Sequence, residues 1–308
     1  MLGWIAFDYW PVTVHVGHKP KQFSIQMPRK DKRKLEFFFR EMCFLEGWAY
    51  TLWGSKPVSI DNYTEPKEVI RQNLKYDTLK TKILGCFWPP NWGIICYVCN
   101  PTQLKIKNGW NTLNKYSYLV DKSQFALFSD CCDNATVSMT LVNKTALHNI
   151  VSIHFKEFQP TLEKLSMDLD SLSDSQKLDT FLLETSLHDN LIGILLGYGK
   201  DNAHLFNENK IHAETQQFSN ESTPWPMSSA WPEEEMENLD HLNQKIFTFK
   251  QWDLDDLFYP RFVCDLQSQE SQHLKHKYRE DRAKILEYYR GKDVVEASLT
   301  LLIAKSDS

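Results

Sequence analysis

The chain has 308 residues, of which 42% are hydrophobic and 24% charged, and its formal net charge is −5. This length and composition provide enough apolar surface to bury a core, in one large domain or two ordinary ones. Because phosphate backbones bind net basic surfaces, the negative charge argues against nucleic acid as the main partner, although a local basic patch remains compatible with it.

The first 28 residues are predicted to form an N-terminal extension. The segment Met1–Val16 is mostly apolar and basic segments follow it, which reverses the order of a signal peptide. Two interpretations stay open: a strand that packs on the domain, or the end of a membrane anchor with aromatic residues at the interface. The chain has no uninterrupted apolar run of about 18 residues, the length of a membrane-spanning helix.

Residues 29–165 are predicted to form a mixed α/β lobe. Apolar residues recur at helical spacing up to a stop near Gly47, and an extended segment, Ala49–Ile60, follows, broken by a turn at Gly54–Pro57. The basic run Arg29–Lys34 lies at the start of this helix, where the helix dipole disfavours cations. It is either a solvated face or a contact for anionic lipid headgroups.

The rest of this lobe is predicted to contain helices over residues 65–84 and around residues 106–113, and a strand over residues 94–98. Residues 125–141 are predicted to form a β-hairpin, because apolar residues alternate along its second strand. Asn143 follows as the predicted N-cap of a helix. A polar linker is predicted near residues 165–175.

Residues 176–308 are predicted to form a mainly helical lobe, which could be continuous with the first. A long helix covers residues 178–207, and another begins at the N-cap Ser268 and ends at Gly291. The spacing of Asp293 and Glu296 predicts a capping box for a short terminal helix. The predicted fold class is therefore α+β and predominantly helical, with a small antiparallel sheet in the N-terminal lobe.

The stretch HDNLIGILLGYGKDNAHLF, His188–Phe206, raises the question of a phosphate-binding loop. The P-loop motif requires Ser or Thr after its lysine, but Asp201 follows here. Gly193 and Gly197 are four residues apart and would lie on one helix face. We therefore predict a buried helix that crosses a neighbour closely at these two glycines.

A metal site is the alternative interpretation of the same stretch. Metal-dependent phosphohydrolases of the HD type combine a helical histidine, an adjacent His-Asp pair and a distant aspartate, and the metal activates water. His154, the pair His188 and Asp189, and then Asp253 or Asp255 follow this order. The simpler interpretation is a core histidine and a chance pair.

The seven cysteines are predicted to be mostly reduced, buried thiols of an intracellular protein. Cys96 and Cys99 form one CxxC pair, but a structural zinc site would need a second pair at similar spacing. An oxidised Cys96–Cys99 pair stays open. No cofactor is predicted.

Three stretches together resemble a group of Chlamydiae proteins without an assigned activity, those of the chlamydia-like environmental bacteria in particular. The stretches are KLEFFFREMCFLEGWAYTLWGSKPVSI, LIGILLGYGKDNAHLF and FYPRFVCDLQSQESQHLKHKYREDRAKILEYYRGKDVVE, and the resemblance covers about residues 28–297. It implies an obligate intracellular bacterium, with the protein in the cytoplasm or at the inner membrane or envelope. It implies no functional residue.

The first functional hypothesis is a non-catalytic interaction or structural protein, for which the envelope is one fitting location. Its protein partner is not identified, and Trp225 and Trp231 in the TPWPMSSAWP segment are the predicted contacts, because tryptophan is favoured at interface hot spots. The alternative is the HD-like phosphohydrolase centred on His188 and Asp189. A third hypothesis is membrane association through the N-terminus and the Arg29–Lys34 run.

Overall fold

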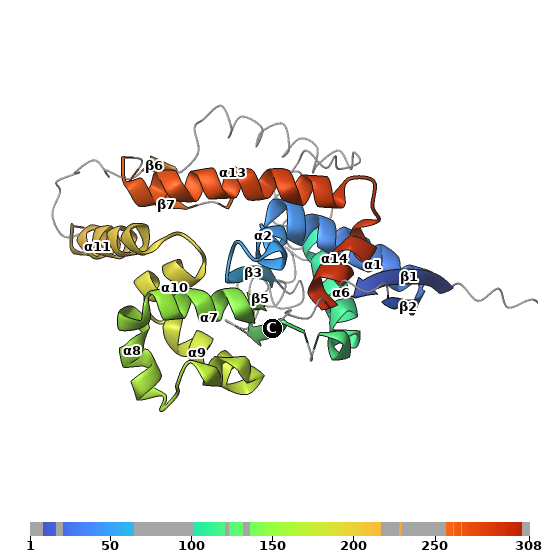
Figure 1. Ribbon diagram of the computed structural model, residues 1–308, viewed down its shortest axis with the longest axis horizontal. Helices are drawn as coiled ribbons and strands as arrows, with labels where there is room; N and C mark the ends of the chain where they lie inside the picture. The colour runs from blue at the N-terminus through green and yellow to red at the C-terminus, as the bar shows by residue number, and fades with distance from the viewer. Residues whose placement is uncertain are drawn as a thin grey trace, which may run out of the picture.

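The computed structural model describes residues 9–16, 21–64, 101–120, 123–131, 136–216, 228–229, 257–260, 262–265 and 267–303. Within these residues the fold is α+β and predominantly helical, as predicted. A small antiparallel sheet lies in the middle of the molecule, with helices around it (Figure 1). None of the described helices is long and apolar enough to cross a membrane.

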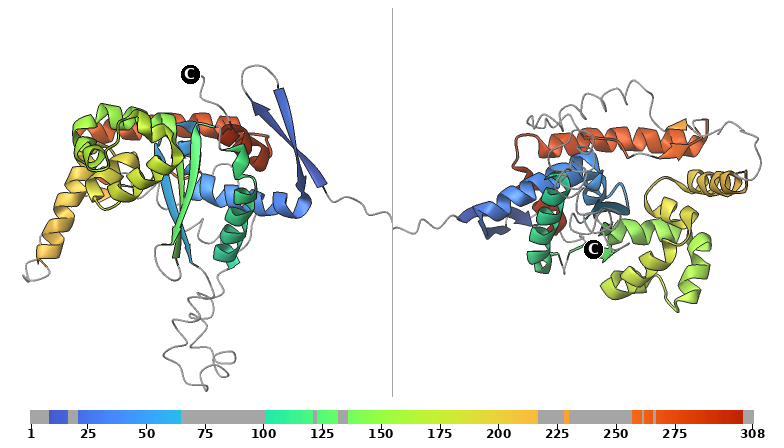
Figure 2. Two further views of the ribbon diagram at one scale, coloured as in Figure 1. Left: turned by 90° about the horizontal axis from the view of Figure 1, so that it is seen from below. Right: turned by 180° about the vertical axis from the view of Figure 1, so that it is seen from behind.

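The described part of the N-terminal extension is a β-hairpin. β1 (Tyr9–Val16) pairs antiparallel with β2 (Lys21–Pro28), in a register that sets Tyr9 opposite Pro28. The hairpin lies at one end of the molecule and contacts the last helix, α14 (Val294–Ile303) (Figure 2). Ile25 and Met27 of β2 are buried in the core, so the second strand is anchored by apolar packing.

The first predicted helix is confirmed, and the extended segment after it is partly wrong. α1 (Arg29–Phe39) continues into a π-helical turn, η1 (Arg40–Leu45), and Gly47 ends the run at a φ of 79°. Residues 49–53, predicted to be extended, belong to the short helix α2 (Trp48–Trp53). Trp48 and Tyr50 are both buried against aromatic rings, so tertiary packing overrides the local β preference.

The central sheet has the strand order β3-β5-β4. Its strands are β3 (Val58–Thr64), β4 (Phe125–Cys131) and β5 (Thr136–Asn143), all antiparallel to their neighbours, which confirms the predicted hairpin. Asn143 accepts a 3.0 Å hydrogen bond from the backbone N–H of Ala146 and caps α7 (Lys144–Ile153), also as predicted.

Two hydrophobic cores lie against this sheet. The first is built by α1, η1, α2 and α14 together with α6 (Pro101–Lys115) and α13 (Gln269–Tyr289). The second is built by α7, α8 (Phe155–Lys164), η4 (Asp170–Ser173), α9 (Ser175–Thr185), α10 (Asp189–Leu195) and α11 (Lys200–Gln216). The short elements η3 (Ser117–Leu119), β6 (Ser228–Ser229) and β7 (Val263–Cys264) complete the described fold.

The two cores do not follow the sequence division into residues 29–165 and 176–308. The C-terminal helices α13 and α14 belong to the first core, beside α1 and α2, although they lie at the other end of the sequence (Figure 1). In the predicted linker near residues 165–175, Leu172 of η4 is buried in the second core. That segment therefore packs as part of the fold.

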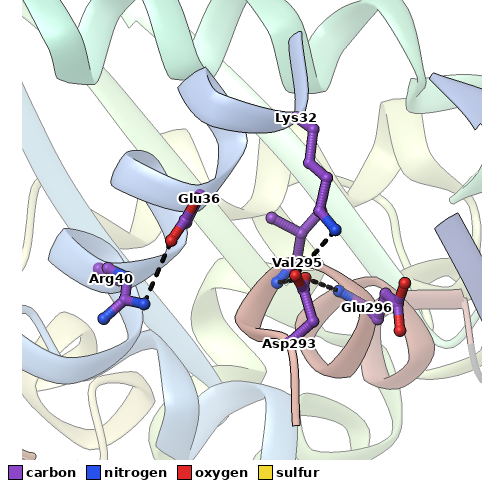
Figure 3. A network of polar contacts seen from close by, with 6 residues as sticks. All are labelled: Lys32, Glu36, Arg40, Asp293, Val295 and Glu296. Carbon is purple, nitrogen blue, oxygen red and sulfur yellow. Dashed lines mark hydrogen bonds and ion pairs between the residues drawn. The ribbon is translucent and has the colours of Figure 1, made fainter. Parts of the chain in front are cut away.

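The predicted caps of the last two helices are confirmed. Ser268 accepts a hydrogen bond from the Ser271 N–H at 3.0 Å, and Gly291 follows α13 at a φ of 70°. Asp293 accepts hydrogen bonds from the N–H groups of Val295 and Glu296 at 3.0 and 3.1 Å (Figure 3).

An ion pair joins the first helix to the last. The Lys32 ammonium of α1 lies 2.8 Å from the Asp293 carboxylate, and Arg40 at the start of η1 pairs with Glu36 of α1 at 3.2 Å (Figure 3). Lys32 therefore has a structural role, in contrast to Arg29, Lys30 and Arg33 of the same run.

Candidate functional site

The stretch His188–Phe206 is not part of one long helix. The helix predicted over residues 178–207 is wrong, because the chain forms α9, α10 and α11 with turns between them. Gly197 and Gly199 lie in the second turn at φ values of 80° and 88°. Only glycine adopts such values without strain, and these two residues therefore end one helix and turn the chain toward the next.

The two predicted packing glycines have different surroundings. A Cβ atom on Gly193 would lie 2.9 Å from Cβ of Ala203, so α10 and α11 approach closely at this point. Gly197 is outside a helix, which corrects the prediction that both glycines share one helix face. A Cβ atom on Gly197 would lie 2.5 Å from the Tyr278 hydroxyl oxygen, so the close neighbour of Gly197 is α13.

A carboxylate of the protein occupies the start of α11, where a bound phosphate would lie in a phosphate-binding loop. Glu270 accepts hydrogen bonds from the backbone N–H groups of Lys200, Asp201 and Asn202 at 2.8, 2.9 and 3.2 Å. Helix N-termini attract anions, and here the anion is supplied by α13. The GYGK turn therefore joins α11 to α13.

The described residues do not form the predicted metal site. They contain no group of three or more His, Cys, Asp or Glu side chains placed to hold a metal ion. His188 is exposed before α10, Asp189 begins that helix, and His154 lies at the junction of α7 and α8. Other predicted site residues lie outside the described residues: Asp253, Asp255, Trp225, Trp231, Cys96 and Cys99.

A groove rich in cations lies between α1 and α6. Its volume is about 630 Å³, and we call it the basic groove. It is lined by Arg29, Lys30, Arg33, Lys34, Phe37, Lys105 and Asn108. Four of these seven residues belong to the Arg29–Lys34 run. Phe37 lies further along α1, and Lys105 and Asn108 belong to α6.

Positive charge exceeds negative charge along the groove. No acid is among its described lining residues. The carboxylate of the nearby Asp31 is shared by Lys34 at 3.6 Å and Lys115 at 3.5 Å. Arg29, Lys30 and Arg33 form no hydrogen bond or ion pair with any of the residues that the structure describes. Arginine and lysine side chains without a protein partner bind phosphate oxygens readily, because their hydrogen-bond donors are available.

The helix start adds to this preference for anions. Pro28 precedes α1 as its N-cap residue and supplies no side-chain cap to the N–H groups of the first turn. The positive end of the helix dipole therefore coincides with the cations, an arrangement that a bound anion would relieve. By comparison, α7, α9 and α13 each receive a side-chain cap.

The α6 side of the groove was missed by the sequence analysis. The Lys105 ammonium lies 4.8 Å from the centre of the Phe37 ring and so closes one wall by a cation–π contact. The run of basic residues indicated the α1 side of the groove. The contact of α1 with α6 joins parts of the chain that are far apart in sequence. No local pattern indicated it.

Among the family models, curated proteins and solved structures compared with the chain, none matches it. The resemblance to Chlamydiae proteins stays a prediction. Function is therefore inferred from geometry and charge.

Proposed function

We propose that this protein is a binding protein that attaches to anionic membrane surfaces through the basic groove. The observation that carries the proposal is the position of Arg29, Lys30 and Arg33, which have no partner among the described residues, beside the start of α1, where Pro28 supplies no side-chain cap. A phosphate-bearing headgroup would pair with these cations and accept hydrogen bonds from the first turn of the helix.

Simple electrostatics gives the scale of the interaction. Each lysine or arginine near an anionic bilayer contributes about 1 kcal/mol, so three of them contribute about 3 kcal/mol. The chain as a whole carries a net charge of −5, so the same surface repels the molecule overall. Attachment is therefore weak, oriented and sensitive to salt.

The position of the groove favours such an orientation. β2 runs directly into α1, so the hairpin and the start of α1 lie at the same end of the molecule (Figure 2). The first residues of α1 line the groove, which therefore lies near the hairpin. One membrane surface could therefore contact both the hairpin and the basic groove.

The test is co-sedimentation with vesicles that contain phosphatidylserine, over a range of salt concentrations. We expect binding that falls steeply with salt and is absent with neutral vesicles. Lys30→Glu should weaken binding roughly tenfold or more, because it removes one attraction and adds one repulsion. The matched control is Lys156→Glu on α8, an exposed lysine outside the groove, which should change binding less than about twofold.

Three results would contradict the proposal: no binding to anionic vesicles, equal losses for Lys30→Glu and Lys156→Glu, or binding that salt leaves unchanged. Preferential binding of an RNA oligomer over vesicles would assign the groove to another partner.

The other two hypotheses from the sequence stay predictions. An HD-like phosphohydrolase requires His188 and Asp189 to meet a third donor at one ion, and the described residues supply none. Elemental analysis of the purified protein tests it. The partner contact at Trp225 and Trp231 requires a change in the pull-down profile when both are replaced by alanine.

A further inference from the structure

A second, smaller pocket contains a buried lysine. Its volume is about 170 Å³, and it shares no lining residue with the basic groove. It lies between the end of η1, the start of β3, the turn from α10 to α11, and the segment around Tyr259. Its polar lining comes from Glu46, Lys56, Asp61, Tyr198 and Tyr259.

The backbone around Lys56 is held rigidly. The carbonyl oxygen of Tyr50 accepts hydrogen bonds from the N–H groups of Ser55 and Lys56 at 2.8 and 3.2 Å. Immediately afterwards, the carbonyl of Pro57 accepts a 2.9 Å hydrogen bond from the Asn143 N–H of β5. The lysine is therefore placed by both α2 and the central sheet.

The side chain of Lys56 is enclosed by two glycine backbones. A Cβ atom on Gly197 would lie 3.4 Å from Cγ of Lys56, and one on Gly47 would lie 4.0 Å from its Nζ. Both glycines have positive φ values and line the path of the side chain. Lys56 is only 6% exposed as a result.

The amine of Lys56 has no partner among the described residues. It forms no hydrogen bond and no ion pair there, although Glu46 and Asp61 line the same pocket. Buried lysines are almost always paired, because burial of an unpaired ammonium is costly. An unpaired one that ends in a pocket therefore indicates a ligand.

Burial of Lys56 favours the neutral amine. Burial lowers the pKa of Lys56 to about 8, against the opposing effect of Asp61 and Glu46. Burial and the neighbouring Glu46 raise the pKa of the Asp61 carboxyl. Near neutral pH the pocket can thus hold an amine that loses its proton easily and a carboxylic acid that keeps its own.

We propose that Lys56 is a reactive amine that binds small neutral carbonyl compounds, such as hydroxyaldehydes, as a Schiff base in this pocket. The volume admits only a few non-hydrogen atoms, since drug-sized ligands need about 300 Å³ or more. The negative charge of Glu46 on the wall repels anionic carbonyl compounds such as keto acids. Asp61, Glu46 and the tyrosines offer hydrogen-bond partners to ligand hydroxyl groups.

The chemical step is a condensation with loss of water. Nζ of the neutral Lys56 bonds to the carbonyl carbon and gives a carbinolamine. The carbon–oxygen bond then breaks, and the two amine hydrogens leave with the oxygen as water, so that a C=N bond remains. Asp61 in its acid form can protonate the departing hydroxyl and take up the proton that nitrogen releases. No oxidant or reductant is needed.

The test is competitive labelling within one molecule. The folded protein is treated with dilute glycolaldehyde and cyanoborohydride at neutral pH, and the reduced adducts are located by peptide mass mapping. We expect Lys56 to gain the hydroxyethyl group roughly tenfold faster than the exposed Lys156, because burial lowers the pKa of the Lys56 amine. Labelling in urea should abolish the preference.

Two further outcomes decide the proposal. Asp61→Asn should slow labelling of Lys56 and leave Lys156 unchanged, in a variant whose thermal unfolding shows that it is folded. Labelling of Lys56 in the wild-type protein no faster than that of Lys156 would overturn the proposal, whatever the variant does. Both results are independent of vesicle binding, because the two sites share no residue.

Discussion

Replacement of Gly197 by alanine tests the packing role of the GYGK turn. Gly197 has a φ of 80°, and a Cβ atom there would lie 2.5 Å from the Tyr278 hydroxyl oxygen. That hydroxyl donates a 2.7 Å hydrogen bond to the Gly197 carbonyl oxygen. Tyr278 is fully buried, with Tyr50 and Phe262 beside its ring, so it has little room to move away.

The expected destabilisation combines three effects. Alanine in the left-handed region costs about 1 kcal/mol, the lost hydrogen bond about 1 kcal/mol, and the steric overlap about 1–2 kcal/mol. Gly197→Ala should therefore lower the free energy of unfolding by about 3–4 kcal/mol.

Gly291 provides the matched control. Its φ is 70°, but a Cβ atom there would meet nothing within 4 Å. Gly291→Ala should therefore cost only the backbone strain of about 1 kcal/mol. Both variants are measured by urea denaturation, followed by tryptophan fluorescence, with equal m-values as the condition for comparison. Equal losses for the two variants would refute the close approach of Gly197 to α13.

Three other predictions concern buried and capping groups. Burial raises the pKa of Glu41 from 4.5 to about 7, so ionisation of this carboxyl destabilises the fold as pH rises through that range. Relative to the wild type, the free energy of unfolding of Glu41→Gln should rise by up to about 3 kcal/mol between about pH 4.5 and pH 8, measured by urea denaturation. A difference between the two proteins that does not change with pH would contradict this. Glu270→Gln removes the charge at the start of α11 and should cost about 1 kcal/mol in the same assay, whereas an unchanged stability would show that the cap is unimportant. Burial raises the pKa of Cys43 to about 12, so iodoacetamide at pH 8 should label it only after unfolding, and rapid labelling of the native protein would contradict its burial.

Local signals in the sequence predicted much of the fold. Asn143, Ser268 and Asp293 cap the helices that they were predicted to cap, since capping depends on backbone groups within three residues. The hairpin of β4 and β5 could also be predicted from the sequence, because the alternation of apolar residues fixes its two faces. The basic run at the start of α1 is a local signal of the same kind.

The contacts that define the sites are not local. Glu270, which caps the start of α11, comes from another helix, α13. The sequence around Gly197 does not show this contact, and its apolar spacing alone is that of a helix interior. Likewise, nothing near Lys56 in the sequence shows that Gly197 will enclose it. Helix propensity also misled at residues 178–207, where the positive φ values of two glycines break an otherwise continuous apolar stripe.

The most direct test of the proposed function is hydrogen–deuterium exchange with and without phosphatidylserine vesicles. Binding through the basic groove predicts slower exchange in α1 and α6, and unchanged exchange in α8 and α9 on the opposite core. Protection confined to α8 and α9, or no protection anywhere in the presence of vesicles, would contradict the assignment of the groove as the membrane contact.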